Sequence, residues 1–156
     1  MYQQEFMDRA IQLGIAGMNR NEGGPFGAVV VQNNVIVGEG NNQVILLNDP
    51  TAHAEVVAIR NACKNLGVYQ LTDCIIYSSC EPCPMCLGSI YWARPLKVFF
   101  GCTREDAADV GFDDNFIYEE LKVQHQYRKI PFLNQGRKSA LSAFQIWKNK
   151  IDKQQY

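Results

Sequence analysis

Two short polar segments, each opening a predicted helix, constrain the fold of this chain more than any other feature. Residues 51–55 read TAHAE and residues 80–86 read CEPCPMC. Cys83 and Cys86 stand three positions apart at a helix start, so their sulfurs project from one face. With His53 they make three ligands for a tetrahedral Zn²⁺ whose fourth position stays open. We therefore expect two helix N-termini, far apart in sequence, to meet at one site.

The charges in the two segments suit a metal that activates water. A helix N-terminus favours negative charge and lowers the pKa of a cysteine placed there. A neutral His53 as third ligand keeps the metal acidic enough to activate water. Glu55 lies on the same helical turn as His53, where it could take a proton from that water and pass it to a leaving amine. Glu55 is not expected to be a ligand.

Each segment has a simpler interpretation when taken alone. A Cys-x-x-Cys pair is often a redox pair or half of a structural zinc site. Cys80 could add a third sulfur and close a four-ligand site. The two segments together with Glu55 favour a catalytic zinc. The other histidine, His125, lies in a polar stretch and is expected at the surface.

Length and composition indicate one ordinary globular domain. The chain has 156 residues, of which 47% are hydrophobic and 20% charged. It begins without the layout of a signal peptide and has no apolar run of ~20 residues, so we expect a cytoplasmic protein without a membrane span. Reduced cysteines are the rule there. Cys63, Cys74 and Cys102 are therefore expected to be small buried hydrophobes.

Charge is distributed unevenly along the chain. Residues 121–156 hold eight Lys/Arg and one acid, whereas the rest holds seven Lys/Arg and fifteen acids. This pattern favours a basic tail that packs on an acidic body, within one subunit or between two. A nucleic-acid surface is not expected, because the formal net charge is only −1.

Hydrophobic patterning predicts an α/β fold. Helices are expected over 5–19, 52–66, 84–93, 103–108, 115–121 and 140–150, and strands over 26–31, 35–40, 74–78 and 96–100. Strand–helix–strand alternation predicts a mostly parallel sheet, mixed because of the opening hairpin. Asn33-Asn34 suits the hairpin turn. Asp49 or Thr51 could cap the second helix, and Gly67 would end it.

His-Ala-Glu at 53–55, followed by Pro-Cys-x-x-Cys at 82–86, resembles the cytidine-deaminase-like superfamily of zinc nucleobase deaminases. With residues 49–55, 79–88 and 111–118, the chain is similar to bacterial guanine deaminases over its length. The resemblance implies a three-layer sandwich with a mixed sheet between helices, and a Zn²⁺ cofactor. It also implies hydrolysis at C2 of guanine to xanthine and ammonia, with Glu55 moving protons.

The same resemblance implies a set of substrate-binding residues. Asp114 could bind the N–H edge of guanine and help move protons, and Asn42 could bind ring nitrogens or the carbonyl. Phe26 could stack on the purine, and Ala54 and Trp92 could line the pocket. The simpler alternatives are a solvated Asp114, a turn-capping Asn42, and a Phe26 and a Trp92 in the core.

In such enzymes the C-terminal segment, here about 122–156, exchanges between two subunits and closes the partner's site. The resemblance therefore implies a homodimer in which Tyr156 acts as a lid. A frayed terminus is the simpler alternative.

Several alternatives stay open. The substrate could be guanosine, cytosine, a triazine amine or a tRNA adenosine. A structural-zinc interaction module predicts a closed four-ligand site, and a redox protein predicts a reversible Cys83–Cys86 disulfide.

Overall fold

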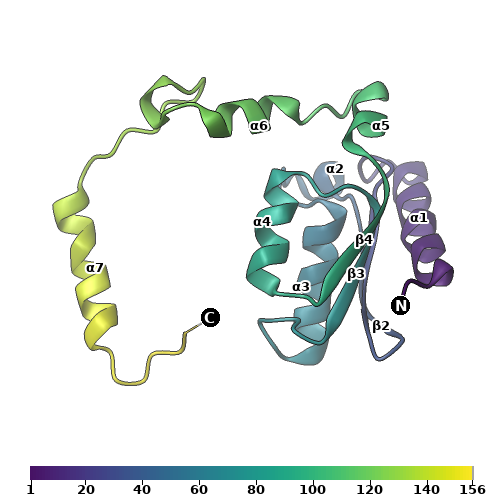
Figure 1. The fold of residues 1–156 in the computed structure, drawn as a ribbon, viewed down its shortest axis with the longest axis horizontal. Helices are drawn as coiled ribbons and strands as arrows, with labels where there is room; N and C mark the ends of the chain where they lie inside the picture. Colours follow the sequence, from purple (N-terminus) through teal and green to yellow (C-terminus); the bar gives the residue numbers. More distant parts are fainter. Residues whose placement is uncertain (156) are drawn as a thin grey trace. The chain divides into compact units, whose positions relative to one another are not determined.

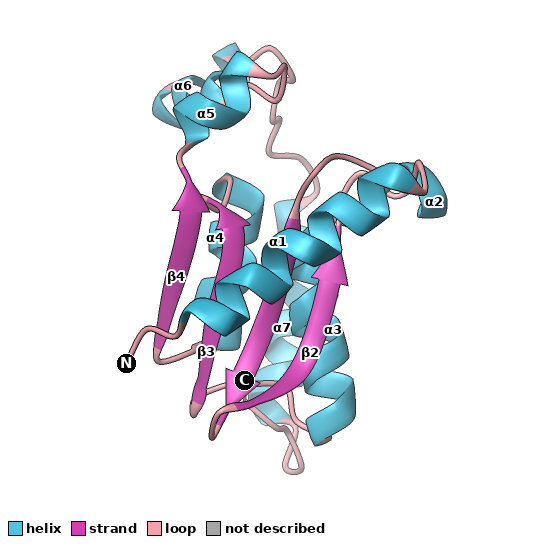
Figure 2. Cartoon of the chain, turned by 90° about the vertical axis from the view of Figure 1, so that its right-hand side faces the viewer, coloured by secondary structure: helices cyan, strands magenta, loops and turns pink. Residues whose placement is uncertain are grey.

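A computed structural model describes residues 1–155 as two compact units, Met1–Asp114 and a second that starts at Asn115. The first unit holds a four-stranded sheet in the order β2-β1-β3-β4. Strand β1 (Gly27–Gln32) pairs antiparallel with β2 (Val35–Asn41) and with β3 (Cys74–Cys80). Strand β3 runs parallel to β4 (Lys97–Cys102). Figure 2 shows the four strands with α1 crossing in front of them.

The predicted mixed sheet is confirmed: β2, β3 and β4 run in one direction, and β1, inserted between β2 and β3, runs in the opposite direction. Only β3 and β4 are hydrogen-bonded neighbours that run parallel, and helix α4 (Pro84–Ala93) makes the crossover between them. Helix α3 (Ala54–Leu66) carries the chain from β2 past β1 to β3. Strand β3 therefore enters antiparallel to β1.

Helices cover both faces of the sheet, as the three-layer prediction requires (Figure 1). Helix α1 (Gln4–Asn19) packs on one face through Phe6, Met7 and Ala10, against Val29 and Tyr77. Helices α3 and α4 pack on the other face, where small side chains of α3 meet β1 and β3. Side chains on the two faces of β3 thus belong to two separate hydrophobic cores. The predicted metal site lies on the face that α3 covers.

Most of the predicted turns and helix boundaries are confirmed. Asn33 and Asn34 have φ of 51° and 62°, as a hairpin turn with positive φ requires. Gly67 ends α3 with φ of 68°, and Pro84 begins α4.

The predicted cap of α3 is wrong. The N-cap is His53, which makes no side-chain cap hydrogen bond. Asp49 Oδ1 instead accepts from Thr51 N at 2.8 Å and from Thr51 Oγ1 at 2.7 Å, which closes the turn before the helix. A short helix, α2 (Val44–Leu47), was not expected and lies between β2 and this turn.

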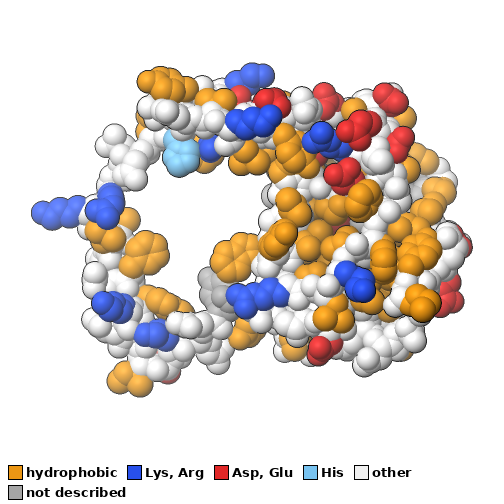
Figure 3. Space-filling model, viewed as in Figure 1, with side chains coloured by type: hydrophobic (Ala, Val, Ile, Leu, Met, Phe, Trp, Pro, Cys, Tyr) orange, Lys and Arg blue, Asp and Glu red, His pale blue; other side chains and the backbone are white. Residues whose placement is uncertain are grey.

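The first unit ends with α5 (Arg104–Asp109) and the loop to Asp114. The second unit contains α6 (Asn115–Lys122), the 3₁₀ turn η1 (His125–Tyr127) and α7 (Arg137–Asn149). None of its described residues is buried, and His125 is exposed as predicted. Apolar and basic side chains lie together on α7 (Figure 3). Among the described residues, no helix is long and apolar enough to cross a membrane.

Candidate active site

Two helix N-termini meet on the α3 side of the sheet, as the sequence predicts. His53 is the N-cap of α3, Cys83 is the N-cap of α4, and Cys86 lies in the first turn of α4. Pro84 occupies the first turn, where its missing N–H leaves no helical bond unmade. Both caps have extended backbone, with ψ of 156° and 169°.

The three side chains fit a zinc ion. The donor atoms of His53, Cys83 and Cys86 lie within 4.8 Å of one another. His53 Nδ1 is 3.6 Å from both sulfurs. Bonds of about 2.3 Å to sulfur and about 2.0–2.1 Å to nitrogen, at a tetrahedral angle, put N and S roughly 3.6 Å apart. The distance from the imidazole nitrogen to each sulfur is therefore that of a tetrahedral zinc site.

The sulfurs and the imidazole influence one another's protonation. A hydrogen bond from the Cys86 thiol lowers the pKa of Cys83 to about 4 and raises the pKa of Cys86. The hydrogen bond with Cys83 also raises the pKa of His53. A thiolate at Cys83 is thus favoured within the cluster, and a thiolate is the form that binds metal.

Glu55 lies beside this cluster and is almost fully buried, with 6% of its surface exposed. Its Oε2 is 3.4 Å from Cys86 Sγ, and its Oε1 accepts from Ser78 Oγ at 3.1 Å. Burial raises the pKa of Glu55, because a low-dielectric site disfavours the charged carboxylate. A carboxyl group with a raised pKa next to a metal site is suited to exchange protons with a reacting molecule.

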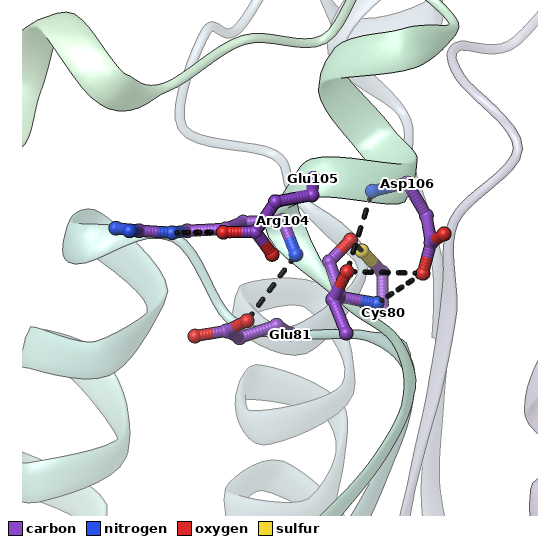
Figure 4. A network of polar contacts seen from close by, with 6 residues as sticks. Cys80, Glu81, Arg104, Glu105 and Asp106 are labelled. Atoms are coloured by element: carbon purple, nitrogen blue, oxygen red, sulfur yellow. Dashed lines mark hydrogen bonds and ion pairs between the residues drawn. The ribbon is translucent and has the colours of Figure 1, made fainter.

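Cys80 does not join the metal ligands found among the described residues. Its thiol donates to Thr103 O at 3.5 Å, at the junction of β4 and α5 (Figure 4). Glu81 Oε2 accepts from Arg104 N at 3.2 Å, which joins the cysteine loop to α5. Thr103 and Asp106 close a capping box that starts α5. The cysteine loop is therefore anchored to the segment that leads to Asp114.

Asp114 lies close enough to the metal donors for Cys83 to affect its pKa. Burial raises the pKa of Asp114, and the charge on Cys83 raises it further. The loop that carries Asp114 is held by Phe112, whose ring packs edge-on against Phe26 with centroids 4.9 Å apart. Phe112, two residues before Asp114, thus joins this loop to Phe26.

Asn42 is buried at the end of β2, with 6% of its surface exposed. Its backbone N donates to Phe26 O at 2.9 Å, and its side-chain Oδ1 accepts from Val44 N at 3.2 Å. Gly23 packs so closely that a Cβ there would lie 2.0 Å from Asn42 Oδ1. The amide oxygen is therefore held by the protein, and the Nδ2 group is left to donate.

Of the remaining predicted residues that the structure describes, Ala54 is buried and Trp92 is exposed. The Ala54 side chain is fully buried in the core between α3 and the sheet. Trp92 is 64% exposed on α4, so the alternative that placed it in the core is wrong. Cys102 is exposed, contrary to expectation, because the side chain at the end of an edge strand is left uncovered. Tyr156 lies outside the described residues.

Three residues with contacts at the site are not among those predicted from the sequence. Ser78 contacts Glu55, Glu81 anchors the cysteine loop, and Phe112 packs on Phe26. Glu81 could have been singled out from the sequence, because it lies between Cys80 and Cys83 in the cysteine motif. Phe112 lies within the 111–118 segment that carries the resemblance, but its contact with Phe26 does not follow from it. Ser78 carries no signal in one sequence, because its role depends on a tertiary contact.

Known proteins resemble this chain over much or all of its length. The guanine deaminase of Bacillus subtilis (strain 168) is 54% identical over 156 residues, which covers 100% of both chains. The X-ray structure of guanine deaminase from Bacillus subtilis superposes with a TM-score of 0.96, covering 100% of this chain and 99% of that one. A tRNA-specific adenosine deaminase of Haemophilus influenzae is 37% identical over 125 residues, 80% of this chain and 67% of that one.

A structure of guanine deaminase from Nitrosomonas europaea is more distant, with 27% identity and a TM-score of 0.69 over 72% of this chain and 65% of that one. Residues 1–102 match the family described as the cytidine and deoxycytidylate deaminase zinc-binding region. These residues include all three donors of the cluster and Glu55, so zinc is the cofactor that the site holds. The chain belongs to the cytidine and deoxycytidylate deaminase zinc-binding family.

Proposed function

We propose that this protein is a zinc-dependent guanine deaminase, which hydrolyses guanine to xanthine and ammonia. The observation that carries the proposal is the buried Glu55 carboxyl beside a three-donor cluster with zinc spacing. The 54% identity to a guanine deaminase over the full chain supports this choice of substrate.

In this proposal His53, Cys83 and Cys86 hold the zinc. When bound, zinc lowers the pKa of a coordinated water toward about 7 and so supplies a nucleophile at neutral pH. Glu55 accepts the proton of the attacking water and delivers it to the amine at C2, which leaves as ammonia. Burial keeps bulk water away from Glu55, so the proton stays within the reacting group.

Three further side chains would bind the base. Asn42 would donate its Nδ2 hydrogens to an acceptor of guanine, since Val44 N already occupies its oxygen. Asp114 would accept from the N–H edge and assist proton transfer. Phe26 would stack on the purine ring, because its backbone oxygen binds Asn42 N and places it next to that amide. Ala54 would contribute backbone to the pocket wall, and Trp92 would border its mouth.

Ammonia release from a panel of amines tests the substrate. Zinc-loaded protein would be given guanine, guanosine, adenine, cytosine, a triazine amine and a tRNA loop that contains adenosine. We expect rapid release from guanine alone. Release from the tRNA loop instead would favour the activity of the adenosine deaminase relatives and would contradict the roles given to Asn42 and Asp114.

We also propose a homodimer that exchanges its C-terminal segments, about residues 122–156, so that Tyr156 closes the partner's site. Large apolar side chains on α7 support this, since Phe144 is 69% and Ile146 is 71% exposed. Isolated chains rarely leave such a helix uncovered. The basic charge of the segment and the acidic charge of the remainder also favour docking.

Complementation tests the exchange. A chain that lacks residues 150–156 would be mixed, during refolding, with a full-length Glu55→Gln chain. We expect each variant alone to be inactive or weak, and the mixture to regain guanine turnover, because one chain supplies Glu55 and the other the segment. If the mixed chains have the mass of a dimer but are no more active than the two variants measured separately, the exchange is contradicted.

We propose that the protein works in the cytoplasm. A reducing compartment keeps Cys83 and Cys86 as thiols, which is the state that binds zinc.

A further inference from the structure

Ser78 occupies a position in β3 where an apolar residue would be expected. It pairs with Ala28 of β1, which is completely buried, and its own surface is 2% exposed. Its neighbours on that face of the sheet belong to the core that includes Ala54 and Ala58 of α3. Burying a hydroxyl among such side chains costs free energy unless it forms a hydrogen bond.

The hydrogen bond of Ser78 is made to Glu55. The hydroxyl donates to Glu55 Oε1 at 3.1 Å, and the contact is fully buried. The second carboxyl oxygen, Oε2, lies 3.4 Å from Cys86 Sγ, on the side of the metal donors. The two oxygens of Glu55 thus have separate neighbours, one on the sheet and one in the cluster.

We propose that Ser78 is a positioning residue for the proposed deamination, on which this inference rests: it holds Oε1 so that Oε2 faces the His53, Cys83 and Cys86 cluster. A buried carboxylate turns easily about its last torsion, which has no sharp staggered minima. A single donor on one oxygen fixes that torsion. The oxygen that exchanges protons is then already oriented when the substrate binds.

Ser79 provides a matched control on the same strand. It is 8% exposed, and its hydroxyl also takes part in one buried hydrogen bond, accepting from Gly27 N at 3.0 Å. As the next residue in β3 it points to the opposite face of the sheet. Ser78→Ala and Ser79→Ala therefore remove the same group at similar burial, but only the first removes a contact with Glu55.

The kinetic experiment compares zinc-loaded Ser78→Ala, Ser79→Ala and Ser78→Thr. We expect Ser78→Ala to lower kcat for guanine by about 10- to 100-fold, as loss of a hydrogen bond to a charged group predicts, with KM and zinc content unchanged. Ser79→Ala should keep kcat within about twofold, even if its Tm falls. Ser78→Thr keeps the hydroxyl and should recover most of kcat. An equal loss of kcat in both alanine variants would overturn the proposal.

A second readout needs no substrate. In crystals of the zinc-loaded variants, Glu55 should adopt a rotated or a double orientation in Ser78→Ala and its original single orientation in Ser79→Ala. An unchanged Glu55 in Ser78→Ala would overturn the positioning role. If the wild-type protein does not deaminate guanine, the proposed function fails, and the orientation of Glu55 in these crystals still decides the role of Ser78.

Discussion

At the residue scale, Asn42 is held from several sides by short-range contacts. Val44 N binds its oxygen, and Asn41 Nδ2 donates to its backbone oxygen at 3.1 Å. Gly23 leaves no room for a side chain beside it, since a Cβ would lie 2.0 Å from Oδ1 and 2.6 Å from the backbone O. The position of the Asn42 amide thus depends on the absence of a side chain at Gly23.

Gly23→Ala should therefore weaken guanine binding. The added methyl group must displace Asn42, and the loss of one good hydrogen bond to the base should raise KM for guanine about tenfold. Zinc content should not change, because the metal donors are on other elements. Steady-state kinetics with metal analysis would check this.

Gly88→Ala in α4 is the control for Gly23→Ala. A Cβ at Gly88 meets nothing within 4 Å, and alanine favours a helix, so kinetics should be unchanged and stability equal or higher. A Gly23→Ala enzyme with the wild-type KM would contradict the role given to Asn42.

Residues whose chemistry depends on spacing were predictable, and those that depend on tertiary contact were not. His53, Glu55, Cys83 and Cys86 stand out because fixed spacings at helix starts are rare in other contexts. Ser78 does not, because a serine in a strand is compatible with many environments. Its contact with Glu55 exists only once α3 has packed on β3.

At the element scale, the ends of α3 and α4 differ in one informative way. Both helices end at a residue in the left-handed region, Gly67 with φ of 68° and Arg94 with φ of 57°. Glycine adopts this conformation without strain, whereas other L-residues pay roughly 1–2 kcal/mol. The end of α4 is thus less favourable than the end of α3.

Arg94→Gly should stabilise the protein by about 0.5–1 kcal/mol, because it removes this strain at an exposed position. Gly67→Ala should destabilise it by about 1 kcal/mol, although a Cβ there meets nothing within 4 Å, because the cost is conformational. Urea unfolding of the two variants measures both effects. Shifts of the midpoint in the same direction would contradict this account of the two helix ends.

The elements themselves were largely predictable, but their pairing was not. Pro84, Gly67 and the Asn33-Asn34 turn mark boundaries that the structure confirms within a few residues. The direction of β3, parallel to β2, follows the predicted strand–helix–strand alternation, but local patterns do not say that β3 pairs with β1 and not with β2. Asp49 has the chemistry of a cap, but its hydrogen bonds with Thr51 close a turn instead.

At the scale of the whole molecule, the metal joins two parts of the first unit that are far apart in sequence. His53 enters from the connection after β2, and Cys83 and Cys86 enter from the connection after β3. A ligand that binds only the folded chain stabilises it by mass action. Zinc should therefore contribute to stability as well as to catalysis.

Removal of zinc should lower Tm. With free zinc at about 100 times its Kd, the lost stabilisation is about 2.7 kcal/mol, which corresponds to roughly 5–10 °C for a chain of this size. The difference should shrink as pH falls, because binding requires deprotonated thiols. Thermal unfolding with and without a chelator measures it.

His53→Ala is the control for zinc removal. It lacks one donor, so its Tm should respond little to the chelator. If the chelator removes zinc from the wild-type protein and Tm does not change, zinc has no stabilising role.

The most direct test of the central claim is guanine turnover by wild-type protein and by Glu55→Gln, with zinc measured in both. The glutamine keeps the size of the side chain and can still bind Ser78, but it cannot carry a proton. We expect the wild-type protein to convert guanine to xanthine and ammonia, and the variant to lose at least about 10³-fold in kcat while zinc stays at one ion per chain. A variant that retains full zinc and turns over guanine at the wild-type rate would contradict the claim that Glu55 carries the proton in this site.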